Sequence, residues 1–164
     1  MSEPDNYAPV TDLGHGDALS PWRFLVGPKA QVRLLTAMGD LFLLKPHGLL
    51  RRPHVFLLDT FAGQCLLVSD TWEDFKRRMA APDHGVAAWL KFGLLCDLHD
   101  AGKTLTEGQC FSATIPGFIG GRFEIENFEP TPWRIHVHVS GQIFEQVKDL
   151  PPGTPITGID VKWQ

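Results

Sequence analysis

With 164 residues, 43% of them hydrophobic and 21% charged, the chain has the size and composition of one globular domain and not of a disordered segment. Its net charge of −4 argues against broad binding to a phosphate backbone, so we expect no nucleic-acid partner. Its apolar runs are too short for a membrane-spanning helix, and the N-terminus lacks a secretory signal pattern. We therefore expect a cytoplasmic protein with no membrane partner.

The first residues carry little apolar periodicity. Residues 1–20 contain Pro, Asp, Asn, Gly and Ser, a composition that predicts a flexible lead-in. Residues 21–164 are predicted to form a single α+β domain. Within it, residues 22–26 form a first strand or packed segment, which ends at the Gly-Pro turn signal of residues 27–28.

Four short runs rich in Leu, Val and Phe follow, separated by Gly and Pro. They are Val32–Thr36, Leu41–Lys45, His54–Asp59 and Gln64–Ser69. Runs of this length and punctuation are typical of antiparallel strands joined by hairpins. The sequence therefore predicts a β-meander in this part of the chain.

Two helices are predicted after the meander. Asp70 and Glu73 have the spacing of a capping box, which opens the first of them. Apolar residues then recur at three- and four-residue spacing over residues 86–98, which predicts a second amphipathic helix. Gly102 is placed as its C-terminal stop.

The C-terminal third is predicted to add further strands. Gly108–Pro130 is rich in Gly, Pro and Phe, which indicates an irregular loop followed by a strand around Arg122–Asn127. Apolar and polar residues alternate over Arg134–Val139, a pattern that favours another strand. Gln142–Lys148 is expected to be a short helix or turn, and a terminal strand is expected to end at Trp163.

The predicted fold class is therefore α+β. An antiparallel β-meander packs against two central amphipathic helices, with further C-terminal strands. The single domain leaves the oligomeric state open.

Two histidines are the weak candidates for metal ligands. His136 and His138 would share one face of the predicted strand, a geometry that can bind zinc when a third ligand such as Cys110 approaches. Structural zinc sites usually show close ligand pairs on both sides, and none is present here. Solvent-facing histidines are therefore the favoured interpretation, and neither a metal nor another cofactor is expected.

The cysteines do not indicate catalysis. Cys65, Cys96 and Cys110 are spaced singly, which predicts reduced thiols. Cys110 is the one candidate for a nucleophile paired with a histidine base. Its neighbours match no cysteine-hydrolase signature, and free cysteines are common in cores, so we expect no enzymatic activity.

Five carboxylates are the candidate contacts for a partner. Glu124, Glu126 and Glu129 form the densest cluster, and Glu124 and Glu126 would share one face of the predicted strand. Asp97 and Asp100 lie at the end of the second predicted helix. Exposed charges of this kind usually contribute little beyond solvation. An acidic edge can also receive the lysines and arginines of another protein.

Several strings in the chain occur in the same order in one known family. They are Thr36–Leu43, Leu58–Thr60, Asp70–Phe75, Gly108–Pro130 and Val139–Ile143. The more specific patterns are Gly-Gln-Cys-Phe and Gly-Gly-x-x-Glu-x-Glu-Asn, both within Gly108–Pro130. In these strings the chain resembles the C-terminal domain of the type VI secretion DNase-immunity proteins, over about residues 30–156.

The resemblance implies a bacterial cytoplasmic protein that binds and blocks a secreted antibacterial nuclease, without catalysis of its own. Its partner would be the cognate toxin. An inhibitor can mimic the polyanionic substrate of a nuclease with an acidic surface, which the five carboxylates would supply. The alternative is a sensor or adaptor that binds a small ligand or metal near His136, His138 and Cys110.

Overall fold

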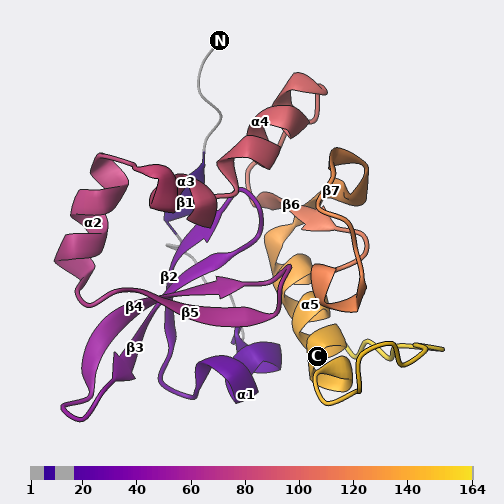
Figure 1. Cartoon of the computed structure of the whole chain (residues 1–164), viewed down its shortest axis with the longest axis horizontal. Helices are drawn as coiled ribbons and strands as arrows, with labels where there is room; N and C mark the ends of the chain where they lie inside the picture. The colour runs from indigo at the N-terminus through magenta and orange to yellow at the C-terminus, as the bar shows by residue number, and fades with distance from the viewer. Residues whose placement is uncertain (1–5, 10–16, 164) are drawn as a thin grey trace.

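Five antiparallel strands in the order β1-β2-β3-β4-β5 form the centre of the computed structural model, which describes residues 6–9 and 17–163 (Figure 1). The strands are Tyr7–Pro9 (β1), Gln31–Thr36 (β2), Leu41–His47 (β3), Arg52–Asp59 (β4) and Gln64–Ser69 (β5). The predicted meander and the α+β class are confirmed. β1 lies inside the segment predicted as a lead-in, and residues 1–5 and 10–16 of that segment lie outside the described residues.

Successive side chains of the central strands point to opposite faces of the sheet, so the sheet has a core on each side. On one face Leu41, Leu43, Phe56 and Leu58 pack with residues of the 3₁₀ helix η1 (Ser20–Trp22), the short helix α1 (Arg23–Val26) and the helix α5 (Trp133–Val147). On the other face Phe42, Val55 and Leu57 pack against the helices α2 (Trp72–Ala80) and α3 (His84–Trp89). The segment 22–26 is thus packed but helical.

The helix α2 begins one residue later than the capping pattern predicts. Its N-cap is Thr71, whose backbone is extended and whose hydroxyl accepts a hydrogen bond from Asp74 N at 3.1 Å. Asp70 is exposed and lies 3.8 Å from His54 Nε2. The prediction of Asp70 as the cap was therefore wrong. The pattern missed Thr71 because the residue three positions after it is Asp74 and not the Glu or Gln of a capping box.

The second predicted helix is two helices. α3 ends at Trp89, and α4 runs over Phe92–Asp100. Lys91 separates them with a left-handed backbone at φ 52°, a conformation that interrupts a right-handed helix. Gly102, at φ 79°, follows the end of α4 as predicted.

The alternating segment Arg134–Val139 is not a strand but the start of α5. The buried residues of α5 recur at helical spacing, and they are Trp133, His136, Val137, Ser140 and Gly141. Three of these five are polar or lack a side chain, so their hydrophobicity does not mark the buried face. The predicted helix or turn over Gln142–Lys148 is the second half of the same helix.

A second sheet pairs β6 (Gln109–Ala113) with β7 (Phe128–Pro132). Between them lie two 3₁₀ turns, η2 (Gly117–Ile119) and η3 (Ile125–Asn127). The strand predicted around Arg122–Asn127 is therefore wrong, and Glu124 and Glu126 do not share a strand face. The strand predicted to end at Trp163 is also wrong, because no strand follows α5 up to residue 163.

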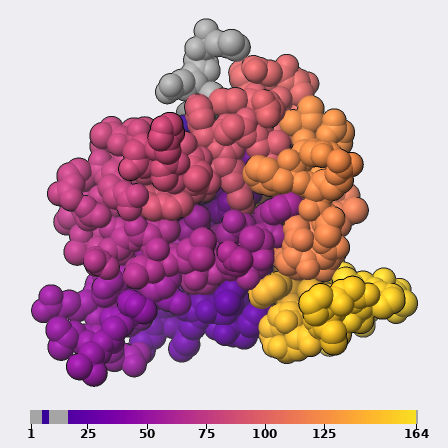
Figure 2. Space-filling model, in the orientation of Figure 1, coloured from indigo at the N-terminus to yellow at the C-terminus, as the bar shows by residue number. Residues whose placement is uncertain are grey.

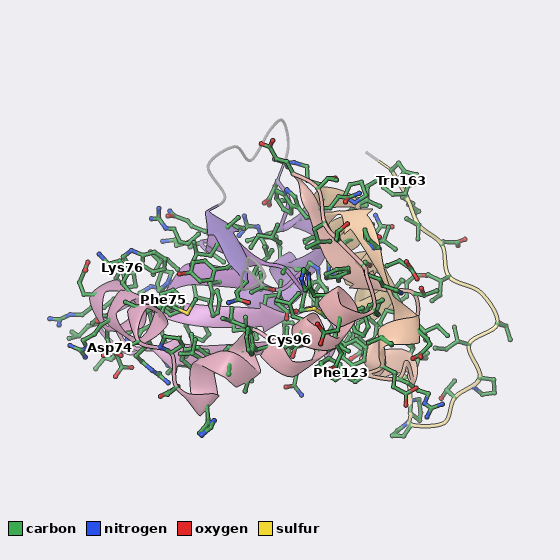
Figure 3. The ribbon with its side chains drawn as sticks, turned by 90° about the horizontal axis from the view of Figure 1, so that it is seen from above. Asp74, Phe75, Lys76, Cys96, Phe123 and Trp163 are labelled. Atoms are coloured by element: carbon green, nitrogen blue, oxygen red, sulfur yellow. The ribbon has the colours of Figure 1, made fainter. Side chains whose placement is uncertain are left out.

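The outer elements surround the sheet on several sides. Figure 3 looks from above and shows α2, with Asp74 and Lys76, at one end of the molecule. The C-terminal segment with Trp163 runs along the opposite end. None of the helices in the described part of the chain is long and apolar enough to cross a membrane.

Candidate functional site

A buried ion-pair cluster joins α4 to the central sheet. Lys91 Nζ lies 2.6 Å from Asp40 Oδ2 and 2.9 Å from Asp59 Oδ1. The side chain of Asp40 is fully buried, and that of Lys91 is 10% exposed. A charge removed from water needs a close partner of opposite sign, so this cluster fixes where α4 starts.

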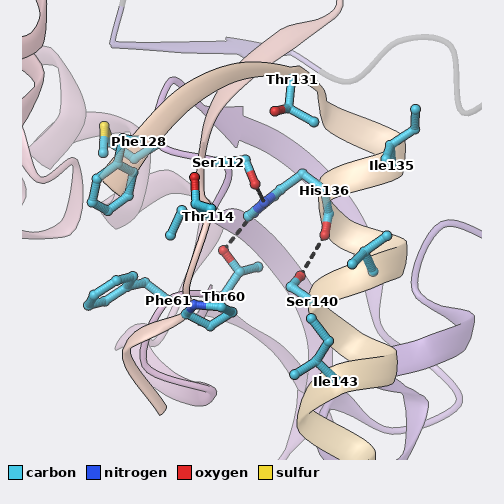
Figure 4. A pocket seen from close by; sticks show the side chains of 14 residues that line it. Thr60, Phe61, Ser112, Thr114, Phe128, Thr131, Ile135, His136, Ser140 and Ile143 are labelled. Atoms are coloured by element: carbon cyan, nitrogen blue, oxygen red, sulfur yellow. Dashed lines mark hydrogen bonds between the residues drawn. The ribbon is translucent and has the colours of Figure 1, made fainter. Parts of the chain in front are cut away.

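A chain of hydrogen bonds extends this cluster to α5 and β6. Asp40 Oδ1 accepts bonds from the backbone N–H of Thr60 at 2.9 Å and from the Thr60 hydroxyl at 3.1 Å. Thr60 Oγ1 also lies 2.9 Å from His136 Nε2, and Ser112 Oγ lies 2.8 Å from His136 Nδ1 (Figure 4). Because the Thr60 proton goes to Asp40, Nε2–H of His136 donates to Thr60 and Nδ1 accepts from Ser112.

Burial controls the protonation of this network. Desolvation lowers the pKa of His136 to about 4, with a smaller contribution from the positive charge of Lys91. Desolvation also raises the pKa of Asp40 to about 6, although Lys91 opposes the shift. Burial alone would lower the pKa of Lys91, but the carboxylates of Asp40 and Asp59 outweigh it and raise that pKa. At neutral pH the imidazole is neutral and the ion pairs are charged.

Cys110 is unsuited to nucleophilic chemistry. Its side chain is fully buried, and burial raises the pKa of its thiol, with the charge of Asp40 acting in the same direction. The thiolate, which is the reactive form, is therefore disfavoured. This geometry argues against the hypothesis of a Cys110 nucleophile.

The structure brings two of the three weak candidates for metal ligands together and separates the third. A Cβ added to Gly39 would meet both His136 Nε2 and Cys110 Sγ, so these two side chains approach the same glycine. His138 lies about 200° around α5 from His136. Its Nε2 is 2.7 Å from the carbonyl oxygen of Lys162, and its ring stacks on Trp163. The shared strand face proposed for the two histidines does not exist.

A pocket of about 140 Å³ lies between α5 and the β6–β7 pair (Figure 4). Its walls are mainly apolar and include Phe61, Phe128 and Ile143, and polar side chains such as Ser112 and His136 also line it. The volume is below the roughly 300–1,000 Å³ of typical small-molecule sites. The pocket is thus large enough for one side chain or a very small ligand.

The five predicted carboxylates lie on neighbouring elements. Asp97 and Asp100 are on the exposed side of α4, which contacts η3. Lys103, just after α4, donates to the carbonyls of Ile125 and Phe128 and to Glu129 Oε1. This single lysine ties the end of α4 to η3 and β7. We call the surface formed by Asp97, Asp100, Glu124, Glu126 and Glu129 the acidic face.

Two of these carboxylates are neutralised locally and three are not. Glu124 pairs with Arg122 at 2.7 Å, and Glu129 pairs with Lys103 at 2.7 Å. Asp97, Asp100 and Glu126 have no ion pair within residues 6–9 and 17–163. Their charges therefore act on the surroundings of the protein.

A rigid loop presents apolar side chains beside the acidic face. Asn127 accepts a hydrogen bond from Ile115 N and donates to the carbonyls of Ile115 and Arg122. A Cβ at Gly121 would overlap the carbonyl oxygen of Ile115, so the loop closes only with glycine there. Ile115 and Phe123 are held 50% and 47% exposed. Exposed apolar side chains with a charged surround are typical of protein interfaces.

The net negative charge of the protein is concentrated in residues 92–132. Residues 92–132 contain six carboxylates and two cationic side chains, which amounts to the full net charge of −4. The other acidic and basic residues balance, thirteen of each. In Figure 2 these residues form one continuous side of the molecule, in the pink to orange colours.

The buried network was missed at the level of sequence. Gly39-Asp40 and Asp59-Thr60 stand in strings that carry the family resemblance, but nothing local shows that they meet. An aspartate directly before an apolar strand and an Asp-Thr pair directly after one were the available signals. Lys91 gave no signal, because a lysine in a helical pattern is usually solvent-exposed.

Comparison with known proteins agrees with the resemblance. Residues 69–144 match the family model described as T6SS immunity protein Tdi1, C-terminal, where T6SS is the type VI secretion system. A search of curated proteins finds no match to the chain. The matched residues include Lys91, Ser112 and His136 of the network and all of the acidic face, whereas Asp40 and Thr60 precede them.

Proposed function

We propose, from the match of residues 69–144 to the C-terminal family of T6SS immunity protein Tdi1, that this chain is a non-catalytic immunity protein that neutralises a secreted nuclease toxin. The acidic face is the proposed contact surface. The observation that carries this choice of surface is the charge distribution, since residues 92–132 hold the entire net charge of −4.

The physical basis is competition with nucleic acid. A nuclease must bind a polyanion, so its active-site surroundings are expected to be cationic. Asp97, Asp100 and Glu126 offer charges without partners in the described residues, and Phe123 offers an apolar anchor beside them. Charge complementarity supports fast and selective association, while burial of the aromatic side chain supports slow dissociation.

Co-expression with the nuclease encoded beside its gene tests the immunity function. We expect a stable complex on gel filtration and restored growth of cells that express the toxin. Absence of both would refute the proposed function.

A matched pair of variants tests the surface. The triple variant Asp97→Asn, Asp100→Asn, Glu126→Gln removes three carboxylates of the acidic face, and Asp70→Asn, Glu73→Gln, Asp149→Asn removes three elsewhere. We expect the first to raise the Kd at least about tenfold and the second less than about twofold. Equal effects would place the contact on another surface.

The pocket favours one alternative, a sensor of a small ligand. Its apolar walls, with polar side chains such as Ser112 and His136 among them, suit a small molecule with a polar group. A thermal-shift screen, with metal analysis of the purified protein, tests this alternative. A metal-free protein that no compound stabilises leaves it without support.

A further inference from the structure

The hairpin that joins β3 to β4 ends in two exposed leucines. Leu49 is 98% exposed and Leu50 is 73% exposed, the highest values among the exposed large hydrophobic side chains of the described residues. The turn is closed by a hydrogen bond from Arg51 N to the carbonyl of Gly48 at 3.2 Å, and Arg51 has a left-handed backbone at φ 48°. The two leucines stand at the apex of a defined turn.

Cationic side chains lie at this end of the sheet. Arg51 and Arg52 follow the leucines directly. Lys45 on β3 is directed away from the apex, with its Nζ 4.2 Å from the centre of the Phe56 ring. Lys29 precedes β2, whose Gln31 pairs with Leu44, so it lies at the same end of the sheet. We call Leu49, Leu50, Arg51, Arg52 and Lys29 the hairpin tip.

Carboxylates are scarce around the hairpin tip. Residues 29–58 contain five cationic side chains and a single carboxylate, Asp40, which is buried and paired with Lys91. One exposed carboxylate, Asp70, lies 3.8 Å from His54 Nε2. His47 and His54 stack edge to face on the same hairpin. The tip therefore carries a local positive charge on a protein whose net charge is negative.

The hairpin tip projects from the molecule at the end opposite the acidic face. In Figure 1 the turn between β3 and β4 lies at the lower left, and α4 and β7 lie at the upper right. Figure 2 shows the same turn as a convex protrusion. A convex apolar apex has no groove to receive another side chain, so its contact must come from a surface into which it inserts.

We propose that the hairpin tip is a peripheral binding site for an anionic lipid surface. Leu49 and Leu50 insert among the acyl chains, while Arg51, Arg52 and Lys29 contact the phosphates of the headgroups. Apolar insertion and attraction to anionic lipids together hold peripheral proteins at a bilayer without a spanning segment. The acidic face then points away from the membrane and stays accessible. This inference does not depend on the immunity function. It departs from the expectation of no membrane partner, which rested on the short apolar runs and so concerned membrane-spanning segments alone.

Vesicle flotation with the full chain tests the proposal. The probes are vesicles of phosphatidylcholine alone and vesicles with about one third phosphatidylglycerol. We expect binding to the anionic vesicles that is at least about tenfold stronger than to the neutral ones and that weakens at high salt. Equal binding to both, or binding to neither, overturns the proposal.

Matched variants locate the contact. Leu49→Ser with Leu50→Ser removes the apex, and Arg51→Gln with Arg52→Gln removes two cations. Each pair is expected to reduce binding at least about tenfold without lowering the Tm. The controls are Leu150→Ser with Ile156→Ser, which are 44% and 41% exposed, and Lys76→Gln with Arg77→Gln. Equal losses in test and control variants contradict insertion at the tip.

A tryptophan at the apex reports insertion directly. In Leu49→Trp the emission maximum of the added tryptophan is expected to shift to shorter wavelength with anionic vesicles and not with neutral ones. A photo-crosslinker at position 49 that forms a defined adduct with a protein, in a chain that binds no vesicle, would identify the tip as a protein-docking site and refute the lipid proposal.

Discussion

His136 and Asp40 titrate over overlapping pH ranges inside one hydrogen-bond network. The pKa of His136 is lowered to about 4, so between pH 4 and 6.5 the unfolded chain binds a proton that the folded chain does not, and stability rises with pH. The pKa of Asp40 is raised to about 6, so between pH 4 and 6 the folded chain holds the extra proton, and stability falls with pH. The two contributions oppose each other in the wild type.

Replacing His136 should expose the Asp40 contribution. In His136→Gln the contribution of His136, which makes stability rise with pH, is lost. The destabilisation relative to wild type should therefore grow from pH 4 to 6.5, with a limiting slope of about 1.4 kcal/mol per pH unit. Urea denaturation at several pH values measures this difference. His84→Gln, at an exposed position, is the control for loss of an imidazole. A pH-independent difference for His136→Gln would contradict the assigned pKa shift.

Gly121 is the residue on which the loop beside the acidic face depends. Its replacement by Ala would push a methyl group into the carbonyl of Ile115, which Asn127 holds in place. We expect a loss of about 1–3 kcal/mol in unfolding free energy and weaker partner binding. The control is Gly93→Ala in α4, where an added Cβ meets no atom within 4 Å and is expected to be neutral or stabilising. Denaturation curves of equal midpoint for the two variants would be inconsistent with the tight closure.

At the scale of elements, the ends of α2 and α4 are positioned by single polar side chains. Thr71 caps α2, Lys91 starts α4, and Lys103 ties the end of α4 to β7. The two lysines join a helix end to a neighbouring segment, whereas Thr71 bonds within the first turn of α2. Changes at these residues should therefore act on whole elements.

The start of α2 gives a direct test of the capping assignment. Thr71→Ala removes the acceptor for Asp74 N and should cost about 1 kcal/mol of stability. Asp70→Ala should cost less, because Asp70 is exposed and caps nothing in the described structure. Chemical denaturation of both variants measures the difference. A larger loss for Asp70→Ala would favour the capping box of the sequence pattern.

Lys91 holds α4 against the sheet. Lys91→Met leaves Asp40 buried without its cation, and we expect a loss of about 3–5 kcal/mol at neutral pH. The loss should shrink below pH 6, where Asp40 is protonated. Lys76→Met breaks the exposed pair with Glu73 and should cost less than about 1 kcal/mol. Similar losses at both lysines would show that the buried cluster contributes no more than a surface pair.

At the scale of the whole molecule, charge is separated between two ends. The acidic face carries the net negative charge, and the hairpin tip is cationic. Such a distribution orients the protein in the field of a charged partner before contact. It also means that the net charge of −4 describes neither end.

Salt should therefore slow association with a cationic partner. If the nuclease is the partner, its association rate should fall at least about tenfold between low and high ionic strength, with little change in dissociation. The triple variant Asp97→Asn, Asp100→Asn, Glu126→Gln should show a shallower salt dependence. Stopped-flow measurements over a salt series provide the rates. An association rate that does not change with salt concentration would argue against electrostatic steering by the acidic face.

The sequence by itself determined the four strands of the meander, the start of a helix near residue 70 and the glycine stop after α4. These features depend on alternation, turn residues and spacing within a few residues of the chain, which are visible without a partner segment. The family resemblance was also visible, because it rests on strings of consecutive residues. The α+β class followed from these local patterns.

Only the tertiary structure decided the helical state of Arg134–Val139, the separation of α3 from α4 and the buried network. His136 faces the core because Ser112 and Thr60, which lie far away in the sequence, bond its two ring nitrogens there. The hydroxyl of Ser140, also buried, donates to the carbonyl of His136 within α5. Lys91 has a left-handed backbone, and its side chain pairs with Asp40 and Asp59, which lie far away in the sequence. Buried polar groups take their positions from partners that folding brings together, and no local pattern of hydrophobicity records those partners.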